Sequence, residues 1–243
     1  MWIFCCGMPR SGSTLQFQIT AQLVEEAGLG KRMEAVKPAA FGKLRKQYAA
    51  EPGWKVFKIH TCTDKVEKEF HRQNAVGIYV YRDLRDVVVS TMRKSDMTFE
   101  ALSSLGFLED RFEEYQKWTS LPRVLVSKYE EMIAGLPAEV RRIAAHLGIT
   151  LSAEAYQQIA AEHSLERQKE RIEASIKNGN LREGVVKGMF YNPTTNLHTN
   201  HIHDGAVGGW KEVLSAEQVE RIEAKAADWL VAHGYDITAE KLS

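Results

Sequence analysis

The feature that most constrains the fold lies at the N-terminus, where a short apolar run leads directly into a loop bounded by two glycines. The run is Trp2–Cys6 and the loop reads GMPRSGST. An apolar run of this length, ended by glycine, predicts a buried strand. After the loop, apolar residues recur at a helical spacing until Gly28, namely at Leu15, Ile19 and Leu23. The start of the chain therefore predicts a strand, a tight loop and a helix.

The same order of strand and helix repeats further along the chain. More strands are predicted from runs rich in apolar, aromatic and β-branched residues: GWKVFKIH (53–60), AVGIYVY (75–81) and RVLVS (123–127). Helical patterns separate the last two, in LRDVVVSTMRK and over residues 98–118. Short buried strands that alternate with helices predict a three-layer α/β fold, with a central parallel sheet and helices on both faces, like that of P-loop nucleotide-binding proteins. Ligands of such sheets bind beyond the carboxyl ends of the strands.

The C-terminal part, from about residue 136, has mostly helical patterns. Pro137 and Gly148 mark the start and the end of one helix. The charged stretch SLERQKERIEASIK predicts an exposed helix, to which we assign no function. A capping box formed by Ser215 and Gln218 opens the closing helix. Because no repeat or linker divides the chain, we predict one domain over residues 1–243, long enough to fold without disulfides or structural metals.

The composition narrows the class of protein. The 32 basic residues balance the 32 acidic ones, which argues against general binding to nucleic acid or to anionic membranes. Three cysteines, with no C-x-x-C pair, suggest neither a disulfide framework nor a zinc site, and Cys5 and Cys6 are expected inside the first strand. The first residues are too short to span a bilayer and lack the basic start of a signal peptide. We therefore expect a soluble, cytoplasmic protein.

The N-terminal loop has the properties of an anion site. Its glycines let the backbone amides turn inward, and the following helix adds its positive end. Arg10 supplies a guanidinium that can grip an oxyanion, and hydroxyls come from Ser11, Ser13 and Thr14. The lysine that follows the second glycine in nucleoside-triphosphate loops is missing, since Ser13 follows Gly12 directly. The alternative is a serine-rich turn between a strand and a helix.

A second candidate anion site lies in YRDLRDVVVS. Arg82 ends a predicted strand, and Ser90 lies eight residues further on, about two turns into the predicted helix. A guanidinium and a hydroxyl placed in this way could hold a second phosphate. The alternative is a cluster of ion pairs around a helix start, formed by Arg82, Asp83, Arg85 and Asp86.

A third group of interest is KIH, at the end of another predicted strand. Lys58 and His60 lie two residues apart and so point to the same face. A histidine there could act as a general base. A single histidine at a strand end is, however, more often structural.

Together these stretches resemble the sulfotransferases that use 3'-phosphoadenosine 5'-phosphosulfate (PAPS), and they follow that family's order along the chain. PRSGST is similar to the loop that holds the 5'-phosphosulfate, with Arg10 where many cytosolic members have lysine. KIH resembles the strand that carries the catalytic histidine. Arg82 and Ser90 match the pair that holds the 3'-phosphate, including their spacing.

Two C-terminal stretches extend the resemblance. VSKYEEM is similar to a family segment that places Tyr129 near the adenosine. DGAVGGWKEVLS resembles the family's Gly-x-x-Gly-x-Trp-Lys element, on Gly205, Gly208, Trp210 and Lys211. The chain departs from the cytosolic members just before that element, where His203-Asp204 replaces an Arg-Lys pair. The resemblance then leaves a basic contact to the 3'-phosphate lost, or supplied by Arg182 or Lys187.

The resemblance implies direct in-line transfer of the sulfuryl group from PAPS to a hydroxyl, with an amine as the second option. His60 would take the acceptor proton, and Lys58 and Arg10 would stabilise charge on the leaving 3',5'-phosphoadenosine (PAP). No metal is implied, because PAPS has no γ-phosphate. The resemblance assigns cofactor binding to Arg10, Ser11, Gly12, Ser13, Thr14, Arg82, Ser90, Tyr129 and Gly205.

Residues 179–209 show no clear periodicity, and we expect them to form a lid on the acceptor side. They contain His198, His201 and His203, an H-x-x-H-x-H pattern that could bind zinc but has no fourth ligand at a typical spacing. Contact with acceptor or cofactor, or simple solvation, explains these histidines as well. MFYNP (189–193) could line the acceptor pocket or serve packing alone.

Two other functions stay open from the residues alone. A P-loop kinase for a small molecule would need a lysine after Gly12 and a carboxylate for magnesium. A non-catalytic nucleotide-binding or interaction module would need neither Lys58 nor His60. The size of the chain and the lack of a membrane anchor favour a soluble small molecule as the acceptor.

Overall fold

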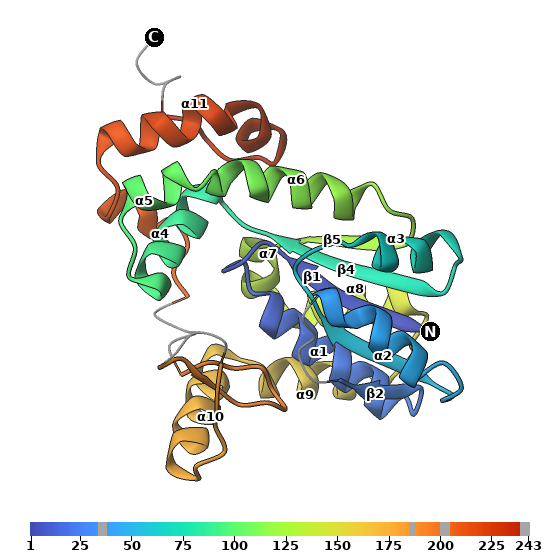
Figure 1. Ribbon diagram of the computed structural model, residues 1–243. Coiled ribbons are helices and arrows are strands. Elements are labelled where there is room, and N and C mark those ends of the chain that lie inside the picture. The colour runs from blue at the N-terminus through green and yellow to red at the C-terminus, as the bar shows by residue number, and fades with distance from the viewer. Residues whose placement is uncertain (34–37, 185–187, 200–204, 239–243) are drawn as a thin grey trace.

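The computed structural model describes residues 1–33, 38–184, 188–199 and 205–238. Its centre is a parallel sheet of five strands in the order β2-β3-β1-β4-β5 (Figure 1). The strands are β1 (Trp2–Gly7), β2 (Gly30–Arg32), β3 (Trp54–Lys58), β4 (Ala75–Tyr81) and β5 (Val124–Lys128). The predicted parallel sheet is confirmed, and β2 is the strand that the sequence analysis missed, because its three residues GKR form no apolar run.

The sheet is covered on both faces, which follows from the alternation of side chains along its strands. On one face Ile3 and Cys5 pack in a core with residues of α1 (Ser13–Glu26) and α8 (Leu136–Leu147). On the other face Phe4 and Cys6 pack with aromatic side chains that include Trp118. Full burial of side chains such as these stabilises the fold by about 1.5–3 kcal/mol each. The expected three layers and the burial of Cys5 and Cys6 are both confirmed.

The face of the sheet that carries Phe4 and Cys6 is covered by helices from the middle and the end of the chain. Trp118 lies in α6 (Phe107–Thr119), and its ring contacts Phe4 and, edge to face, Phe70. The stretch 98–118, expected as one helix, is two helices, because the chain turns at Gly106 with φ 68°. The first of the two is α5 (Phe99–Ser104). Glycine adopts this left-handed conformation easily, and a helix commonly ends where it does so.

The closing helix α11 (Ala216–Ala232) packs over the same side of the molecule as α6 (Figure 1). The capping box of Ser215 and Gln218 is present as predicted. The remaining helices are α2 (Phe41–Gln47), α3 (Asp64–His71), α4 (Leu84–Ser95), α7 (Tyr129–Ala134), α9 (Ala153–Glu162) and α10 (Leu165–Lys177), with short 3-10 turns at Pro38–Ala40 and Gly209–Glu212.

The segment 179–209 contains a small antiparallel hairpin in its described part. Its strands are β6 (Arg182–Glu183) and β7 (Phe190–Tyr191), and a further bridge joins Tyr191 to His198. Within the described part of the chain, no helix has the length and apolar character needed to cross a membrane.

Candidate active site

The N-terminal loop joins β1 to α1 and depends on Gly12. Gly12 is the N-cap of α1 with φ 86°, a conformation that glycine adopts easily, and it brings no side-chain cap. A Cβ at this position would lie 2.8 Å from Cε of Met132 and 2.8 Å from Cδ2 of Tyr129. The chain therefore needs glycine here, and the first turn of α1 presents its amides to the space above the sheet.

The three hydroxyls of the loop do not have the same role. The hydroxyl of Ser11 is buried and lies 2.6 Å from the carbonyl oxygen of Met8 and 2.9 Å from that of Val80. It therefore holds the loop to the end of β4 and is not among the residues that line the cavity next to the loop. Ser13 and Thr14, in contrast, line a cavity of about 820 Å³ next to the loop.

Arg10 connects the loop to the second predicted anion site. Its Nε donates a hydrogen bond of 2.9 Å to Oγ of Ser90 on α4. Its carbonyl oxygen accepts a bond of 3.4 Å from Nη1 of Arg82. Two stretches about eighty residues apart in sequence thus form one continuous site at the carboxyl ends of the strands.

The guanidinium of Arg82 is almost completely buried and stacks on the ring of Tyr129, 4.5 Å from its centroid. It also pairs with Asp86 at 3.2 Å and donates to the carbonyl of Ala206. The hydroxyl of Tyr129 donates to the carbonyl of Gly205 at 3.2 Å. Arg82 and Tyr129 therefore hold the glycine-rich C-terminal element against the strand ends.

Asp86 completes this attachment. Its carboxylate accepts hydrogen bonds from the backbone amides of Gly208 at 2.8 Å and of Trp210 at 3.0 Å. The ion-pair cluster predicted around the start of α4 is also present, and it is centred on Arg85, next to Asp86 in the sequence. Arg85 pairs with Asp83 at 2.8 Å and with Glu223 of α11 at 2.7 Å, all buried. The ion-pair interpretation of YRDLRDVVVS is confirmed for Arg85, which holds the fold, while Arg82 and Ser90 line the cavity.

Lys58 and His60 meet just beyond the end of β3, as their spacing predicted. Nζ of Lys58 lies 3.3 Å from Nε2 of His60. Nδ1 of His60 lies 2.9 Å from the carbonyl oxygen of Gly7. Since a carbonyl can only accept, Nδ1 carries the proton and Nε2 keeps its lone pair. Burial, assisted by the Lys58 ammonium, lowers the pKa of His60 to about 3, so its imidazole is neutral at pH 7.

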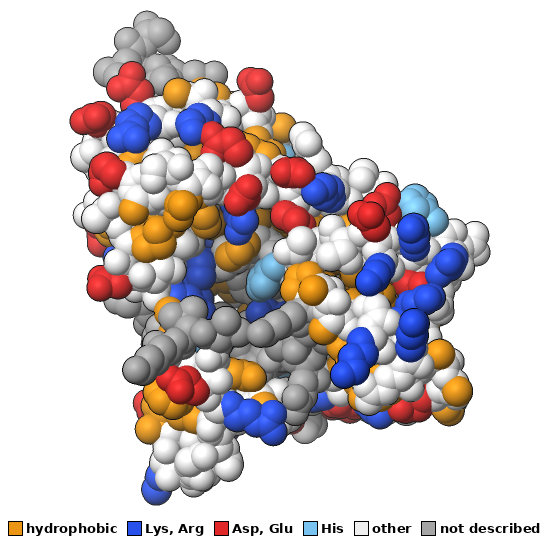
Figure 2. All heavy atoms as spheres, viewed as in Figure 1, with side chains coloured by type: hydrophobic (Ala, Val, Ile, Leu, Met, Phe, Trp, Pro, Cys, Tyr) orange, Lys and Arg blue, Asp and Glu red, His pale blue; other side chains and the backbone are white. Residues whose placement is uncertain are grey.

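The electrostatics of the site are those of a cation cluster. Burial lowers the pKa of Arg10 to about 10, with a further contribution from Arg82. Burial and the charge of Arg10 lower the pKa of Lys58 to about 8, and burial with Arg10 and Lys58 does the same to Lys94. Like charges that depress one another's pKa values favour a bound anion. Figure 2 shows Lys and Arg side chains together with a histidine in the hollow at the middle of this face.

Some cavity residues were not predicted from the sequence. Arg93 and Lys94 continue the face of α4 that carries Ser90, and Leu165 opens α10, the helix to which no function was assigned. The four-residue step from Ser90 to Lys94 is the one signal that could have found Lys94. His163 also lines the cavity, within a polar network described below.

The basic residues and histidines of the expected lid are only partly described. Arg182 is exposed in β6 and is not among the residues that line the cavity, while Lys187, His201 and His203 lie outside the described residues. His198 packs against the Tyr191 ring at 5.4 Å. Burial and the charges of Lys94, Lys58 and Arg10 lower the pKa of His198 to about 4. The described ranges hold no group of three potential metal ligands.

Comparison with known proteins shows similarity to sulfotransferases. The family model described as "Sulfotransferase domain" matches residues 2–231. The chain is 23% identical to amine sulfotransferase of Oryctolagus cuniculus, over 91% of this chain and 78% of that protein. It is 21% identical to sulfotransferase 1C2 of Homo sapiens, over 91% and 80% of the two chains.

Two solved structures share the fold. One is a mouse sulfotransferase, SULT7A1, complexed with PAP, with a TM-score of 0.69 and 16% identity over 94% of this chain and 83% of that one. The other is a retinol dehydratase in complex with androsterone and PAP, with a TM-score of 0.64 and 19% identity over 94% and 80% of the chains.

Proposed function

Since the chain belongs to the sulfotransferase domain family, we propose that it transfers the sulfuryl group from PAPS to a hydroxyl group of a small-molecule acceptor, with the whole chain acting as one domain. The observation that carries the proposal is the Arg10–Ser90 hydrogen bond. It joins the two predicted anion sites along one side of a large cavity, where one donor with two anionic ends can contact both.

The donor would bind with its ends in two different places. Its 5'-phosphosulfate lies on the amides of the Gly12 turn, with the hydroxyls of Ser13 and Thr14. Its 3'-phosphate lies against Arg82 and Ser90. Tyr129 and Gly205, joined by their hydrogen bond, close the site over the nucleotide. PAP in the two similar structures supports a nucleotide of this kind.

His60 would act as the general base, through Nε2. Burial and the Lys58 ammonium, which lies beside this nitrogen, keep the imidazole neutral and so able to accept a proton. The negative charges of PAPS would raise the pKa of His60, because they oppose the cations that add to the effect of burial. Lys58 and Arg10 would then turn to the oxygen that links phosphate and sulfur, where charge develops during transfer.

In the transfer itself, the acceptor oxygen forms a bond to sulfur as the bond from sulfur to the phosphate oxygen breaks. The acceptor proton goes to His60, and PAP leaves with the electron pair of the broken bond. A general base of this kind contributes about 10²–10⁴-fold to the rate.

The acceptor side lies beyond Lys58 and His60, and the segment 179–209 is its proposed lid. Its described residue Leu197 lines the cavity. The names of the relatives point to small molecules. One relative is named for an amine, and the structures of a retinol dehydratase contain androsterone or retinol. These names support a small molecule as the acceptor of this chain.

A thermal-shift experiment with PAP, ATP with magnesium, and AMP tests the donor. A ligand at a hundred times its dissociation constant adds about 2.7 kcal/mol of stability, which raises the melting temperature of a chain of this size by about 5–10 °C. We expect the largest rise with PAP. A rise with ATP and magnesium alone would support a kinase, and no rise with any nucleotide would support a non-catalytic module.

A further inference from the structure

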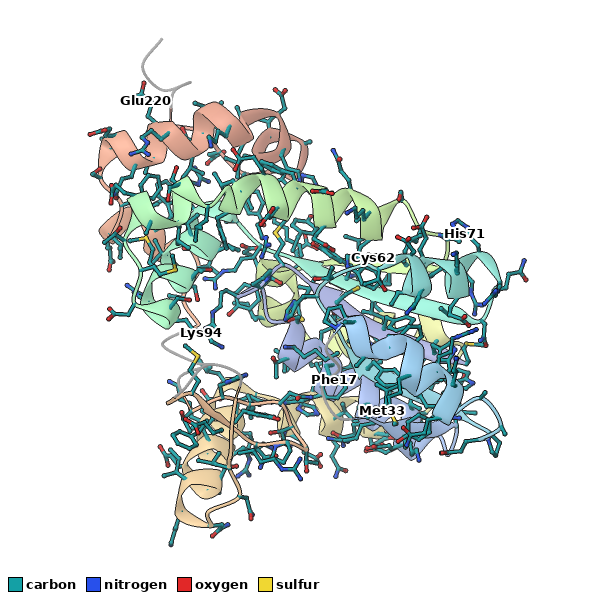
Figure 3. The ribbon with its side chains drawn as sticks, in the orientation of Figure 1. Phe17, Met33, Cys62, His71, Lys94 and Glu220 are labelled. Atoms are coloured by element: carbon teal, nitrogen blue, oxygen red, sulfur yellow. The ribbon has the colours of Figure 1, made fainter. Side chains whose placement is uncertain are left out.

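Lys94 is a cation in the cavity for which neither the fold nor the proposed donor site accounts. It lies in the last turn of α4, four residues beyond Ser90, and so on the same face of the helix. This face lines the cavity with Asp86, Ser90 and Lys94 in succession. Figure 3 labels Lys94 at the edge of α4 nearer to α10.

The side chain of Lys94 is half-buried. Among the described residues, no carboxylate oxygen lies within the 4.0 Å of an ion pair with its Nζ. The charges that act on it most are those of Arg10 and Lys58. Holding a third cation close to two others costs free energy, and a protein surface normally avoids this cost by turning a lysine into solvent.

The position of Lys94 in the cavity indicates which of the two substrates it contacts. The adenosine end of the cavity is marked by Tyr129, Gly205 and Leu165, which lie together: the Tyr129 hydroxyl and the Leu165 methyls are within 3.7 Å of a Cβ built on Gly205. Lys94 lies one helical turn, about 5.4 Å, beyond Ser90, on the side away from Asp86, which holds the glycine-rich C-terminal element. Its charge also acts on the proposed base His60 and on His198 of the proposed lid. Lys94 thus lies towards the end of the cavity away from the adenosine.

We propose that Lys94 binds the acceptor, and that the acceptor is a hydroxyl compound carrying an anionic group, a carboxylate or a phosphate. The inference rests on the proposed sulfotransferase function. The ammonium forms a charge-assisted contact with this anionic group, while the hydroxyl points to Nε2 of His60 and the sulfur. Such a contact brings into the site the negative charge that the cation cluster lacks.

Three phenols of similar size test the charge of the acceptor: 4-hydroxyphenylacetate, which is anionic, 4-ethylphenol, which is neutral, and tyramine, which is cationic. The protein variants are Lys94→Met, which removes the charge but keeps the length, and Lys94→Glu, which reverses it. Lys177→Met is the matched control, because Lys177 also lies in the last turn of a helix but is exposed. Calorimetric titration with PAP is run on every variant.

For the wild-type protein we expect kcat/KM to be highest with 4-hydroxyphenylacetate. Lys94→Met is expected to lose about 10–100-fold with that acceptor, chiefly through KM, and little with 4-ethylphenol, as for the loss of one contact to a charged group. Lys94→Glu is expected to favour tyramine. PAP affinity stays within about threefold of wild type in all variants, and Lys177→Met behaves as wild type.

Other outcomes overturn the inference in distinguishable ways. An equal loss with all three phenols, together with weaker PAP binding, would place Lys94 in the donor site. If the protein binds PAP but does not select the phenols by their charge, this inference is overturned and the proposed function is not. The same holds if it binds PAP but sulfates none of the three phenols. A wild-type protein that does not bind PAP would overturn the proposed function and this inference with it.

Discussion

The ammonium of Lys58 lies 3.3 Å from Nε2 of His60, while Nδ1 of the same ring lies 2.9 Å from the carbonyl oxygen of Gly7. One partner can only accept a hydrogen bond and the other, when charged, can only donate one. The two contacts together leave a single tautomer, in which Nδ1 carries the proton and the lone pair of Nε2 faces the Lys58 ammonium. This is the nitrogen that a general base needs.

This arrangement predicts the tautomer of His60 at neutral pH. In nitrogen NMR spectra at pH 7, Nδ1 should have the shift of a protonated nitrogen and Nε2 that of an unprotonated one, because burial and Lys58 keep the pKa of the ring far below 7. The spectrum should not change between pH 7 and pH 6. An imidazolium, or a proton on Nε2, would rule out this role for the ring.

Replacing His60 should separate binding from chemistry. His60→Ala removes the base but none of the proposed contacts to the nucleotide, so PAP affinity should stay within a few-fold while turnover falls about 10²–10⁴-fold. Calorimetry with PAP and a transfer assay with PAPS measure the two effects. His71→Ala, on the exposed side of α3, is the control and should keep full turnover. Normal turnover in His60→Ala would remove His60 from the mechanism.

The 3'-phosphate should account for the preference for PAP over AMP, which lacks it. Arg82→Ala removes a buried guanidinium and should weaken PAP binding by about 30–1,000-fold, as expected for a buried charge pair worth 2–4 kcal/mol, but AMP binding far less. Calorimetry with both nucleotides measures the ratio of affinities. Because Arg82 also holds Asp86, Ser90→Ala serves as a second variant that keeps this ion pair. A ratio that neither variant changes would contradict the assignment.

His163 should make the protein sensitive to acid. Its Nδ1 accepts hydrogen bonds from Gln168 and Arg171, and its Nε2 donates to Gln22 at 2.9 Å. Burial, with the charge of Arg171, lowers its pKa to about 3, so the folded state resists a proton that the unfolded chain takes up near pH 6.5. The stability that the neutral ring allows is therefore complete above pH 6.5 and is lost as the pH falls from there towards 3.

The size of this effect can be measured with one variant. Between pH 7 and pH 5 the wild-type free energy of unfolding should fall by about 2 kcal/mol more than that of His163→Gln, which cannot titrate. Urea unfolding of both proteins at the two pH values gives the difference. Equal falls would show that His163 takes up its proton as easily in the folded protein as in the unfolded chain.

Much of the site could be predicted because parallel strands bring their carboxyl ends to one edge. The positions of Lys58 and Arg82 follow from where β3 and β4 end, and the loop at Gly12 follows from the end of β1. Local sequence patterns were enough for these three elements. They were not enough for β2, whose pairing with β3 comes from tertiary contact and not from its own residues.

Residues that depend on distant contacts could not be predicted. The Ser11 hydroxyl was predicted to bind the cofactor, but it donates a hydrogen bond to the carbonyl of Val80, 69 residues away. His163 acquires its role from Gln22, which lies 141 residues earlier. Lys94 becomes notable once α4 is known to lie along the cavity.

The most direct test of the account is a crystal structure of the protein with PAP. We expect the 3'-phosphate within hydrogen-bonding distance of Arg82 and Ser90, the 5'-phosphate on the amides of the Gly12 turn, and Nε2 of His60 facing the position of the transferred sulfur. A nucleotide bound in the reverse direction, or with its 3'-phosphate away from Arg82 and Ser90, would contradict it.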